Sequence, residues 1–368
     1  MELTGQTIFI LSNEPWGDIW YSKQNYAYEL SKTNTVFFIN PPKKWNSRNV
    51  FYNPIKTFKY SDSLYILNYQ NFLPIINNVF NIFNNYLVTK YLLHFFKKKK
   101  ITDFIFWSFD PIRLYNPRLF NPKLAIYHCV DLFFFKFIGE KIICENSDLI
   151  IGNSPILLNE YKSFNKPLHY IPHGISEDEF NISKDEQKNN DLSIENYGIY
   201  IGVIDERLDY RLIEKVVQQY PNIDFVFVGP KRYNKDNLVA RNIFENNIYK
   251  NVHAVGPKHF KKLKVYISKA KFCISFMDKN YPGNTIAHHK TMIYLAHGKP
   301  IFGYKFSEYT QLEEIMYMGL THEETIEQLQ HFLENGESSL LSEKRIMFAK
   351  KFTFKQLISS INSILKNY

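Results

Sequence analysis

The stretch YIGVIDERLDYRLIEKVVQQYPNIDFVFVG, from Tyr200 to Gly229, decides the fold of this chain. It opens with the apolar run 200–203, continues through a helix-like segment over 208–219, and ends with a second apolar run over 225–228. Apolar runs that do not alternate with polar residues are typical of strands buried on both faces of a parallel sheet. The stretch therefore predicts a strand, a crossover helix and a parallel strand.

The same alternation extends in both directions from this stretch. Further strand-like runs lie at 7–11, 36–39, 104–107, 124–127, 149–151, 169–171, 272–275 and 300–303, most of them separated by helix-length segments. The segment 176–196 is instead rich in Glu, Asp, Lys, Asn and Ser, as expected of a solvated connection. We therefore predict two tandem Rossmann-like, doubly wound parallel-sheet domains that face each other across a cleft. The predicted boundaries are a first domain 1–175, a linker 176–197, a second domain 198–347 and a carboxyl-terminal helix 348–368 that crosses back to the first domain.

Composition agrees with two folded domains. The chain has 368 residues, which at roughly 150 residues per domain suggests two. It is 45% hydrophobic and only 22% charged, which excludes disorder as its dominant state. The formal net charge of +9 favours anionic partners. Cys129, Cys144 and Cys273 lack the spacing of a metal site or a disulfide framework, so we expect buried thiols in a reducing compartment.

The location of the protein is predicted from two features. No basic segment precedes an apolar run near Met1, and no run approaches the roughly 18 apolar residues of a spanning helix, so we expect a cytoplasmic protein. The Phe-rich stretch 72–100 ends in Lys97, Lys98, Lys99 and Lys100. Such a helix could dock peripherally on the anionic inner face of the cell membrane. A core helix whose lysines complement its carboxyl-terminal dipole explains the pattern equally well, and both interpretations stay open.

The sequence lacks several common motifs for binding cofactors, nucleic acids and metals. The sequence has no GxGxxG after its first strand and no GxxxxGK[ST], which argues against NAD enzymes and P-loop NTPases. Its basic residues are not interleaved with aromatic residues as in nucleic-acid-binding modules, so no nucleic acid partner is expected. Neither a clustered Asp/His site nor a DxD-like motif is evident, so no metal is expected.

Positive signals come from an ordered set of segments that spans nearly the whole chain. Its members are 15–20, 37–42, 127–131, 147–154, 169–175, 200–202, 225–230, 253–257 and 284–300. The set resembles bacterial glycosyltransferases of the GT-B fold, particularly the polysaccharide and teichuronic-acid type within a largely retaining family. The resemblance implies transfer of a sugar from a nucleotide diphosphate-sugar to a cell-surface glycan or lipid-linked acceptor. The first domain would bind the acceptor and the second the donor, with no cofactor and no metal.

The resemblance and the predicted strand ends together supply candidate residues in the first domain. His128 follows the predicted strand 124–127, and imidazole titrates near neutrality, so we predict that it contacts the sugar or assists proton transfer. Asp131 would orient His128 or replace it. The resemblance places Trp16 and Gly17 at the acceptor. The alternative is that His128 is a structural histidine.

The donor site is predicted from the second domain. Gly202 and Gly229 end their strands, where a missing side chain permits close backbone approach to a nucleotide. A diphosphate leaving group needs cations or helix-end N–H groups. The candidate donor residues are Gly202, Arg207, Gly229, Lys231, Val255, Asn284, Thr285 and Lys290, with Arg211 as a further cation. The alternatives are glycines that only make turns and cations that are only solvated.

One position departs from the family. The segment around Lys290 resembles the family's PxKxxEYLAxGKP helix, but Ile293 stands where the family has a glutamate that binds the nucleotide ribose or donor sugar. This departure suggests a changed donor contact, a substitute such as Glu308 or Glu313, or weakened catalysis. It keeps open a catalytically silent nucleotide-sugar-binding partner, and another GT-B enzyme such as an epimerase or phosphorylase.

Overall fold

The computed structural model describes residues 1–368 except 19, 44, 47–54, 75–77, 134, 184–191, 282–283 and 285–287, and does not describe the side chains of residues 78, 260 and 261. The chain forms two compact units. The first comprises Met1–Pro172 together with Phe354–Tyr368, and the second comprises His173–Thr353.

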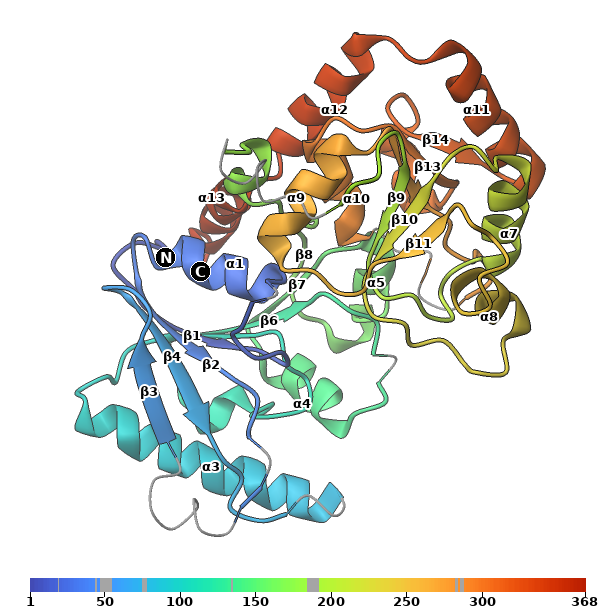
Figure 1. Ribbon diagram of the computed structural model, residues 1–368. Helices are drawn as coiled ribbons and strands as arrows, with labels where there is room; N and C mark the ends of the chain where they lie inside the picture. The colour runs from blue at the N-terminus through green and yellow to red at the C-terminus, as the bar shows by residue number, and fades with distance from the viewer. Residues whose placement is uncertain are drawn as a thin grey trace. The chain divides into compact units, whose positions relative to one another are not determined.

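The first unit is built on an eight-stranded sheet in the order β3-β4-β2-β1-β5-β6-β7-β8 (Figure 1). The strands are β1 (Thr7–Leu11), β2 (Thr35–Ile39), β3 (Ile55–Lys59), β4 (Leu64–Tyr69), β5 (Ile105–Ser108), β6 (Leu124–Cys129), β7 (Leu149–Gly152) and β8 (Leu168–Tyr170). Neighbouring strands are parallel except β3 and β4, which pair antiparallel at one edge. Because the strands other than β3 are parallel, their carboxyl ends all lie at the same end of the sheet.

Helices cover both faces of this sheet. They are α1 (Ser22–Leu30), α3 (Asn78–Lys98), α4 (Ile138–Asn146), α5 (Pro155–Asn159) and α13 (Phe354–Leu365), with a short 3₁₀ turn η1 (Pro117–Leu119). In Figure 1, α3 and α4 lie on one face of the sheet and α1 lies on the other with α13. The two ends of the chain meet there, because the Leu3 amide donates to Oδ1 of Asn362 in α13 at 2.7 Å.

The packing of α3 shows why the central strands are uniformly apolar. Val88, Leu92 and Phe96 recur at intervals of four residues and are buried against β1, where the Phe96 and Phe9 rings stack at 4.1 Å. Helices also lie on the opposite face of the sheet (Figure 1), and all four residues of β5 and all six of β6 are buried. A strand that is buried on both faces has no solvent-facing side, so polar residues do not alternate with apolar ones along it.

The second unit has a six-stranded, wholly parallel sheet in the order β11-β10-β9-β12-β13-β14. Its strands are β9 (Gly198–Ile201), β10 (Phe225–Val228), β11 (Val252–Ala254), β12 (Phe272–Ser275), β13 (Ile301–Tyr304) and β14 (Tyr317–Gly319). Its helices are α7 (Tyr210–Gln219), α8 (Leu238–Phe244), α9 (Phe260–Lys269), α10 (His289–Ala296), α11 (His322–Asn335) and α12 (Ser339–Lys350), with the 3₁₀ turns η3 (Glu177–Phe180) and η4 (Ser307–Leu312).

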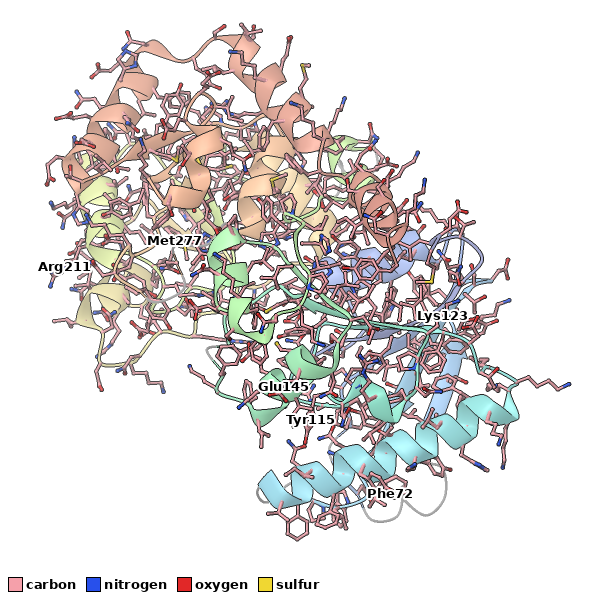
Figure 2. All side chains as sticks on the ribbon, turned by 180° about the vertical axis from the view of Figure 1, so that it is seen from behind. Phe72, Tyr115, Lys123, Glu145, Arg211 and Met277 are labelled. Carbon is pink, nitrogen blue, oxygen red and sulfur yellow. The ribbon has the colours of Figure 1, made fainter. Side chains whose placement is uncertain are left out.

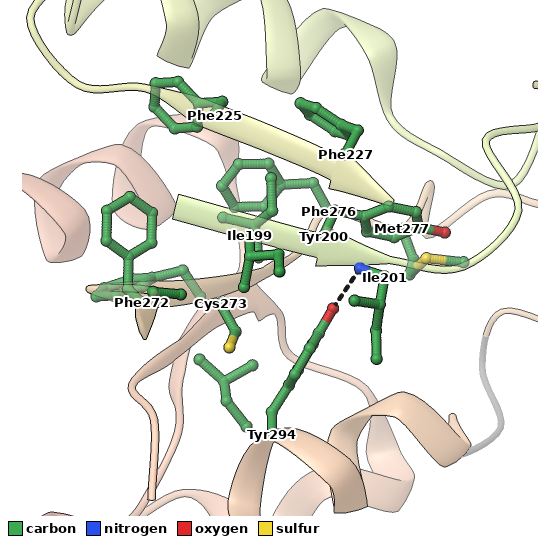
Figure 3. Packing of buried hydrophobic residues seen from close by; sticks show 14 of the residues in the cluster. Ile199, Tyr200, Ile201, Phe225, Phe227, Phe272, Cys273, Phe276, Met277 and Tyr294 are labelled. Atoms are coloured by element: carbon green, nitrogen blue, oxygen red, sulfur yellow. Dashed lines mark hydrogen bonds between the residues drawn. The ribbon is translucent and has the colours of Figure 1, made fainter. Parts of the chain in front are cut away.

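In the core of the second unit, a buried hydrogen bond joins α10 to β9 in addition to apolar packing. The Ile201 amide donates to the Tyr294 hydroxyl at 2.8 Å, and the side chain of Tyr294 is fully buried near Cys273 (Figure 3). Burial raises the pKa of that hydroxyl well above its ordinary value. The contact fixes the height of α10 against the end of β9, and so fixes Lys290 in the first turn of the same helix.

The prediction of two doubly wound parallel-sheet domains is confirmed. Three local features differ from expectation. The β3–β4 hairpin was not predicted, and β6 continues two residues beyond Tyr127, to Cys129. The described part of the predicted linker includes η3, which belongs to the second unit and places Glu179 Oε2 3.3 Å from His297 Nε2. All three cysteines are free and buried, as expected.

The sequence predicts that the carboxyl-terminal segment crosses back to the first domain and that no helix spans a membrane. The predicted crossing segment 348–368 contains the end of α12 and then α13, which belongs to the first unit. Within the described residues, no helix combines the length and the hydropathy needed to traverse a bilayer.

Candidate functional site

Four cationic or titratable side chains gather in the second unit around the beginning of α10: His173, Arg207, His288 and Lys290, here called the cationic cluster. Lys290 is partly buried, and its Nζ donates to the Tyr200 hydroxyl at 3.1 Å and lies 4.2 Å from the centre of that ring. Burial and the charge of Arg207 lower the pKa of Lys290 to about 7. Among the described residues, no carboxylate forms an ion pair with it.

His288 precedes Lys290 as the residue that caps α10. Its backbone N–H donates to the Tyr309 hydroxyl at 3.1 Å, and its Nδ1 lies 2.9 Å from the same oxygen. Burial lowers the pKa of His288 well below its ordinary value, and the charges of Lys290, His173 and Arg207 lower it further. His288 is therefore neutral near pH 7, whereas Arg207 is charged and Lys290 gains a positive charge when it is protonated.

Arg207 differs from Lys290 because it already has a partner. Its guanidinium donates from Nε to Asp205 Oδ1 at 2.9 Å and from Nη2 to Asp205 Oδ2 at 2.8 Å, and this carboxylate raises the pKa of Arg207. Asp205 also opposes the lowering of the Lys290 pKa. Lys290, in contrast, forms no ion pair with a carboxylate among the described residues.

The two glycines directly follow β9 and β10, as predicted, with φ of 134° at Gly202 and 153° at Gly229. A Cβ at Gly229 would lie 1.9 Å from the Gly202 carbonyl oxygen, so the close approach is between two segments of the chain. A Cβ at Gly202 would lie 3.0 Å from the Tyr200 hydroxyl, which itself contacts Lys290. The glycines thus stand beside the cluster, and their contact with a nucleotide stays a prediction.

The remaining donor candidates lie in separate places. Lys231 is exposed and its Nζ donates to the Phe244 carbonyl at the end of α8, at 3.1 Å. The Val255 amide donates to the Phe227 carbonyl at 3.0 Å, within the sheet. Arg211 is exposed on α7 (Figure 2).

Asn284 is 1% exposed and its Nδ2 donates to the carbonyls of Arg207, at 2.9 Å, and Asp278, at 2.8 Å. It therefore fixes the backbone that carries Arg207. Thr285 lies outside the described residues. Of the predicted donor set, the structure brings Gly202, Arg207 and Lys290 together, with Asn284 supporting Arg207 and Gly229 packed on Gly202.

His128 occupies a different position from the one expected. It lies within β6, is 1% exposed, and its Nδ1 accepts a hydrogen bond from Trp107 Nε1 at 3.3 Å. Its ring lies 4.6 Å from that of Phe109 and 5.1 Å from that of Tyr26 in α1. The side chain therefore packs on the α1 face of the sheet rather than beyond the strand end. Because Nδ1 accepts, the neutral ring carries its proton on Nε2.

Asp131 is exposed two residues after β6, and a buried network lies beside it. The Tyr161 hydroxyl donates to Glu140 Oε1 at 2.7 Å, and the Phe135 amide donates to Glu140 Oε2 at 2.8 Å. Burial raises the pKa of Glu140. The carboxylate thus holds the loop that carries Asp131, a role that the local sequence did not reveal although Glu140 follows Asp131 by only nine residues.

The predicted acceptor residues lie near β2. The Trp16 amide donates to Asn40 Oδ1 at 2.8 Å, and its ring lies 5.0 Å from Phe38 and 4.8 Å from Tyr60. Gly17 is exposed, and a Cβ there would meet no atom within 4 Å. Nothing in the packing requires glycine at this position, and acceptor contact stays a prediction for both residues.

Ile293, which replaces the family's glutamate, is partly buried against the core of the second unit. Glu313, one suggested substitute, pairs with Lys305 at 2.9 Å on the surface, and Glu308 is partly buried. Substitution of the glutamate's function by Glu308 or Glu313 stays a prediction. A separate carboxylate, Asp205, acts electrostatically on Lys290. Sequence reasoning missed His173, His288 and Asp205, although the consecutive basic residues 288–290, with no acidic residue among them, were an available signal.

Over the described residues, no group of three or more His, Cys, Asp or Glu side chains is arranged to hold a metal ion. The expectation that the protein uses no metal and no cofactor stays a prediction.

Comparisons with known proteins agree with this architecture. No protein-family model and no curated protein matches the sequence. Among solved structures, the chain is similar to Anabaena HepE in complex with UDP and glucose, with a TM-score of 0.72, 11% identity, and coverage of 99% of this chain and 100% of that chain. It is also similar to sucrose-phosphate synthase from Thermosynechococcus elongatus, with a TM-score of 0.68, 15% identity and 98% of each chain covered.

The chain has the GT-B fold. A third similar structure, an E. coli trehalose-6-phosphate protein bound with UDP-2-fluoro glucose, has a TM-score of 0.68 at 11% identity over 98% of this chain and 99% of that chain. These neighbours are GT-B glycosyltransferases. The resemblance found in the sequence is thus confirmed for the fold, while the retaining, teichuronic-acid type stays a prediction.

Proposed function

We propose that this protein is a glycosyltransferase that binds the diphosphate of a nucleotide diphosphate-sugar at the cationic cluster of its second unit. The observation that carries the proposal is Lys290, a partly buried ammonium that rests on the Tyr200 ring without a carboxylate partner in the described part of the chain. A nearby anion would relieve both its desolvation and its repulsion by Arg207. The amino-terminal end of α10, where Lys290 stands, adds a favourable dipole for that anion.

The chemistry of sugar transfer explains why such a site suits a diphosphate. When the bond between the anomeric carbon and the diphosphate oxygen breaks, negative charge develops on that oxygen. A protonated Lys290, with Arg207 beside it, stabilises this charge more than it stabilises the intact donor. Without ligand, Lys290 is about half protonated near pH 7, and a bound diphosphate raises its pKa.

The finer parts of the proposal follow the resemblance. The transferred group is a hexosyl residue. The acceptor is a growing bacterial surface glycan or a lipid-linked acceptor, bound by the first unit at the inner face of the cell membrane. His128 or Asp131 assists the transfer, Trp16 and Gly17 contact the acceptor, and no metal or cofactor takes part. The support for a sugar nucleotide is the fold shared with a protein solved with UDP and glucose and with one bound with UDP-2-fluoro glucose.

A binding screen tests the donor proposal. The full chain is titrated calorimetrically with ribonucleoside diphosphates, the matching nucleosides and the corresponding sugar nucleotides. Lys290→Met should weaken diphosphate binding at least tenfold and leave nucleoside binding unchanged. Lys250→Met is the matched control, because it removes the same charge from an exposed position of the same unit that is not among the candidate donor residues.

Release of nucleoside diphosphate from the preferred sugar nucleotide then separates an enzyme from a silent binding partner. Turnover supports the transferase. Tight binding with no release in the presence of glycan and lipid-linked acceptors would support the silent partner suggested by Ile293. If no nucleoside diphosphate binds, or if Lys250→Met weakens binding as much as Lys290→Met, the donor proposal fails.

A further inference from the structure

Helix α3 has an apolar surface on both of its sides. Its inner side contributes Val88, Leu92 and Phe96 to the core of the first unit. On its outer side, the exposed apolar residues recur at helical spacing: Val79, Ile82, Phe83, Tyr86, Leu87 and Tyr91, with between 38% and 58% of each side chain accessible. In Figure 2, side chains of α3 project away from the rest of the unit along the whole length of the helix. We call these six residues the outer row.

The outer row continues into a basic end. Lys90 lies within the row, and the exposed positions that follow it along the same helix are His94, Lys97 and Lys98. Lys99 and Lys100 extend the basic run. The stretch 78–100 contains no Asp or Glu. A surface that is apolar along one half, basic along the other and free of acidic residues complements an anionic, partly apolar partner.

We propose that the outer row and the lysines that follow it form a docking surface for an anionic lipid bilayer. At about 1.5 Å per residue the 21 residues of α3 extend about 30 Å, which is long enough to lie along a headgroup layer. The apolar side chains enter the boundary between headgroups and acyl chains, and the lysines contact lipid phosphates. Tyr86 and Tyr91 suit that boundary because their rings are apolar and their hydroxyls reach water.

A lysine within the row favours lipid over a protein partner. Lys90 lies between Leu87 and Tyr91, and its Nζ rests 5.5 Å from the centre of the Tyr86 ring. A protein interface that covered the row would bury this charge without an acidic partner on α3, which is costly. At a bilayer surface the same ammonium extends into the headgroup layer while its stem stays against apolar groups.

This inference deepens the peripheral location that forms part of the proposed function, and it rests on that proposal only for the idea of a membrane-borne acceptor. The experiment therefore uses the full chain without nucleotide or acceptor. The protein is floated with vesicles of phosphatidylcholine alone, and with vesicles in which phosphatidylglycerol is about a third of the lipid, at low and high salt. Failure to float leaves the donor proposal standing, and failure of nucleotide binding leaves this one standing.

Two variants and two matched controls make the test specific. One variant changes three outer-row residues to serine: Ile82, Phe83 and Leu87. Its control also changes three exposed apolar residues to serine, at leucines of the second unit: Leu238, Leu320 and Leu340. The other variant changes the basic run Lys97, Lys98, Lys99 and Lys100 to glutamine. Its control changes four exposed lysines of the second unit, and so makes the same change in net charge: Lys235, Lys250, Lys269 and Lys271.

We expect the parental protein to float with anionic vesicles at low salt, to float little with phosphatidylcholine alone, and to be released at high salt. Each lysine at the surface contributes about fivefold to partitioning, so the four-lysine variant should bind at least tenfold more weakly. The serine variant should also lose at least tenfold, while both controls bind as the parental protein does. Far-UV circular dichroism and thermal melting establish that every variant is folded.

Three outcomes would overturn the proposal. The parental protein could fail to float with anionic vesicles at low salt. The controls could lose as much vesicle binding as the α3 variants, which would mean that the binding depends on the protein's overall charge or apolar surface and not on α3. Light scattering could show a parental dimer that the serine variant converts to a monomer, which would assign the outer row to contact between two copies of this chain.

Discussion

Replacement of Lys290 by methionine should make the unliganded protein more stable and its diphosphate binding weaker. Methionine keeps most of the length of the lysine stem and removes the ammonium that lies over the Tyr200 ring. In the unfolded chain this ammonium is hydrated, whereas in the folded chain it is partly desolvated and repelled by Arg207. The substitution removes that penalty.

The size of the effect follows from the pKa. The fall from 10.5 to about 7, at about 1.4 kcal/mol per pH unit, corresponds to about 5 kcal/mol. Solvent that reaches the partly exposed side chain reduces this value, and loss of the cation–π contact with Tyr200 removes about 1 kcal/mol of favourable energy. We expect a net gain of about 2 kcal/mol in the free energy of unfolding near neutral pH.

The gain should depend on pH in a definite direction. Between about pH 7 and pH 10.5 the unfolded chain holds the Lys290 proton and the folded chain does not, so this group makes the parental protein more stable as pH rises through that window. Below about pH 7 both states are protonated and the penalty is complete. Lys290→Met should therefore be more stable than the parental protein near pH 6.5, and the advantage should fade toward pH 10.

Urea unfolding followed by far-UV circular dichroism measures this difference. Tryptophan fluorescence would not report on the second unit, because all four tryptophans, at positions 16, 20, 45 and 107, lie in the first. Calorimetry above pH 8 in two buffers of different ionisation enthalpy should show uptake of about one proton when a diphosphate binds the parental protein, and none with Lys290→Met. Equal stability of the two proteins at every pH, together with no proton uptake, would refute the reasoning.

Four other substitutions, one of them the control for another, test single positions. Gly229→Ala places a Cβ 1.9 Å from a backbone oxygen and should lower the free energy of unfolding by about 3 kcal/mol in thermal melting, whereas Gly17→Ala, which meets no atom within 4 Å, should change it by under about 0.5 kcal/mol. If the imidazole of His128 takes part in transfer, His128→Ala should reduce turnover about a hundredfold with unchanged donor affinity. A folded variant with parental turnover would move the assignment to Asp131. Tyr161→Phe removes the hydroxyl that donates to the Glu140 carboxylate, so the pKa of Glu140 should rise further. As pH rises above the ordinary pKa of a glutamate, stability should therefore fall more steeply than in the parental protein, a slope measured by melting across pH.

The strands could be predicted from the sequence because their burial leaves a local mark. The run 225–228 is wholly apolar since β10 lies inside its sheet with a neighbour on each side. The hairpin β3–β4 left a weaker mark, because β3 is an edge strand that is exposed over most of its length and alternates little. An unbroken apolar run signals a central strand, and nothing equally local signals an edge strand.

The position of His128 could not be read locally. Its neighbours Tyr127 and Cys129 face the α4 side of the sheet, so His128 faces the α1 side by alternation, where Trp107 from the adjacent strand supplies its hydrogen bond. That partner is 21 residues away and becomes adjacent only when β5 and β6 pair. A polar residue near the end of an apolar run therefore has two explanations, a site at the strand end or a buried hydrogen bond across strands, and the pairing decides between them.

The contrast between two cations of the second unit shows why an ammonium without a carboxylate partner carries functional meaning. Arg345 is completely buried, yet its guanidinium donates to Glu337 Oε2 at 2.7 Å and to the Ile315 carbonyl at 2.7 Å. This unit can therefore neutralise a buried cation with its own groups. Lys290 receives a tyrosine ring, a hydroxyl and a thioether instead, among the described residues, and keeps a lowered pKa. A charge left in that condition reduces the stability of the free protein, and an anion that neutralises it on binding would recover the same free energy as affinity.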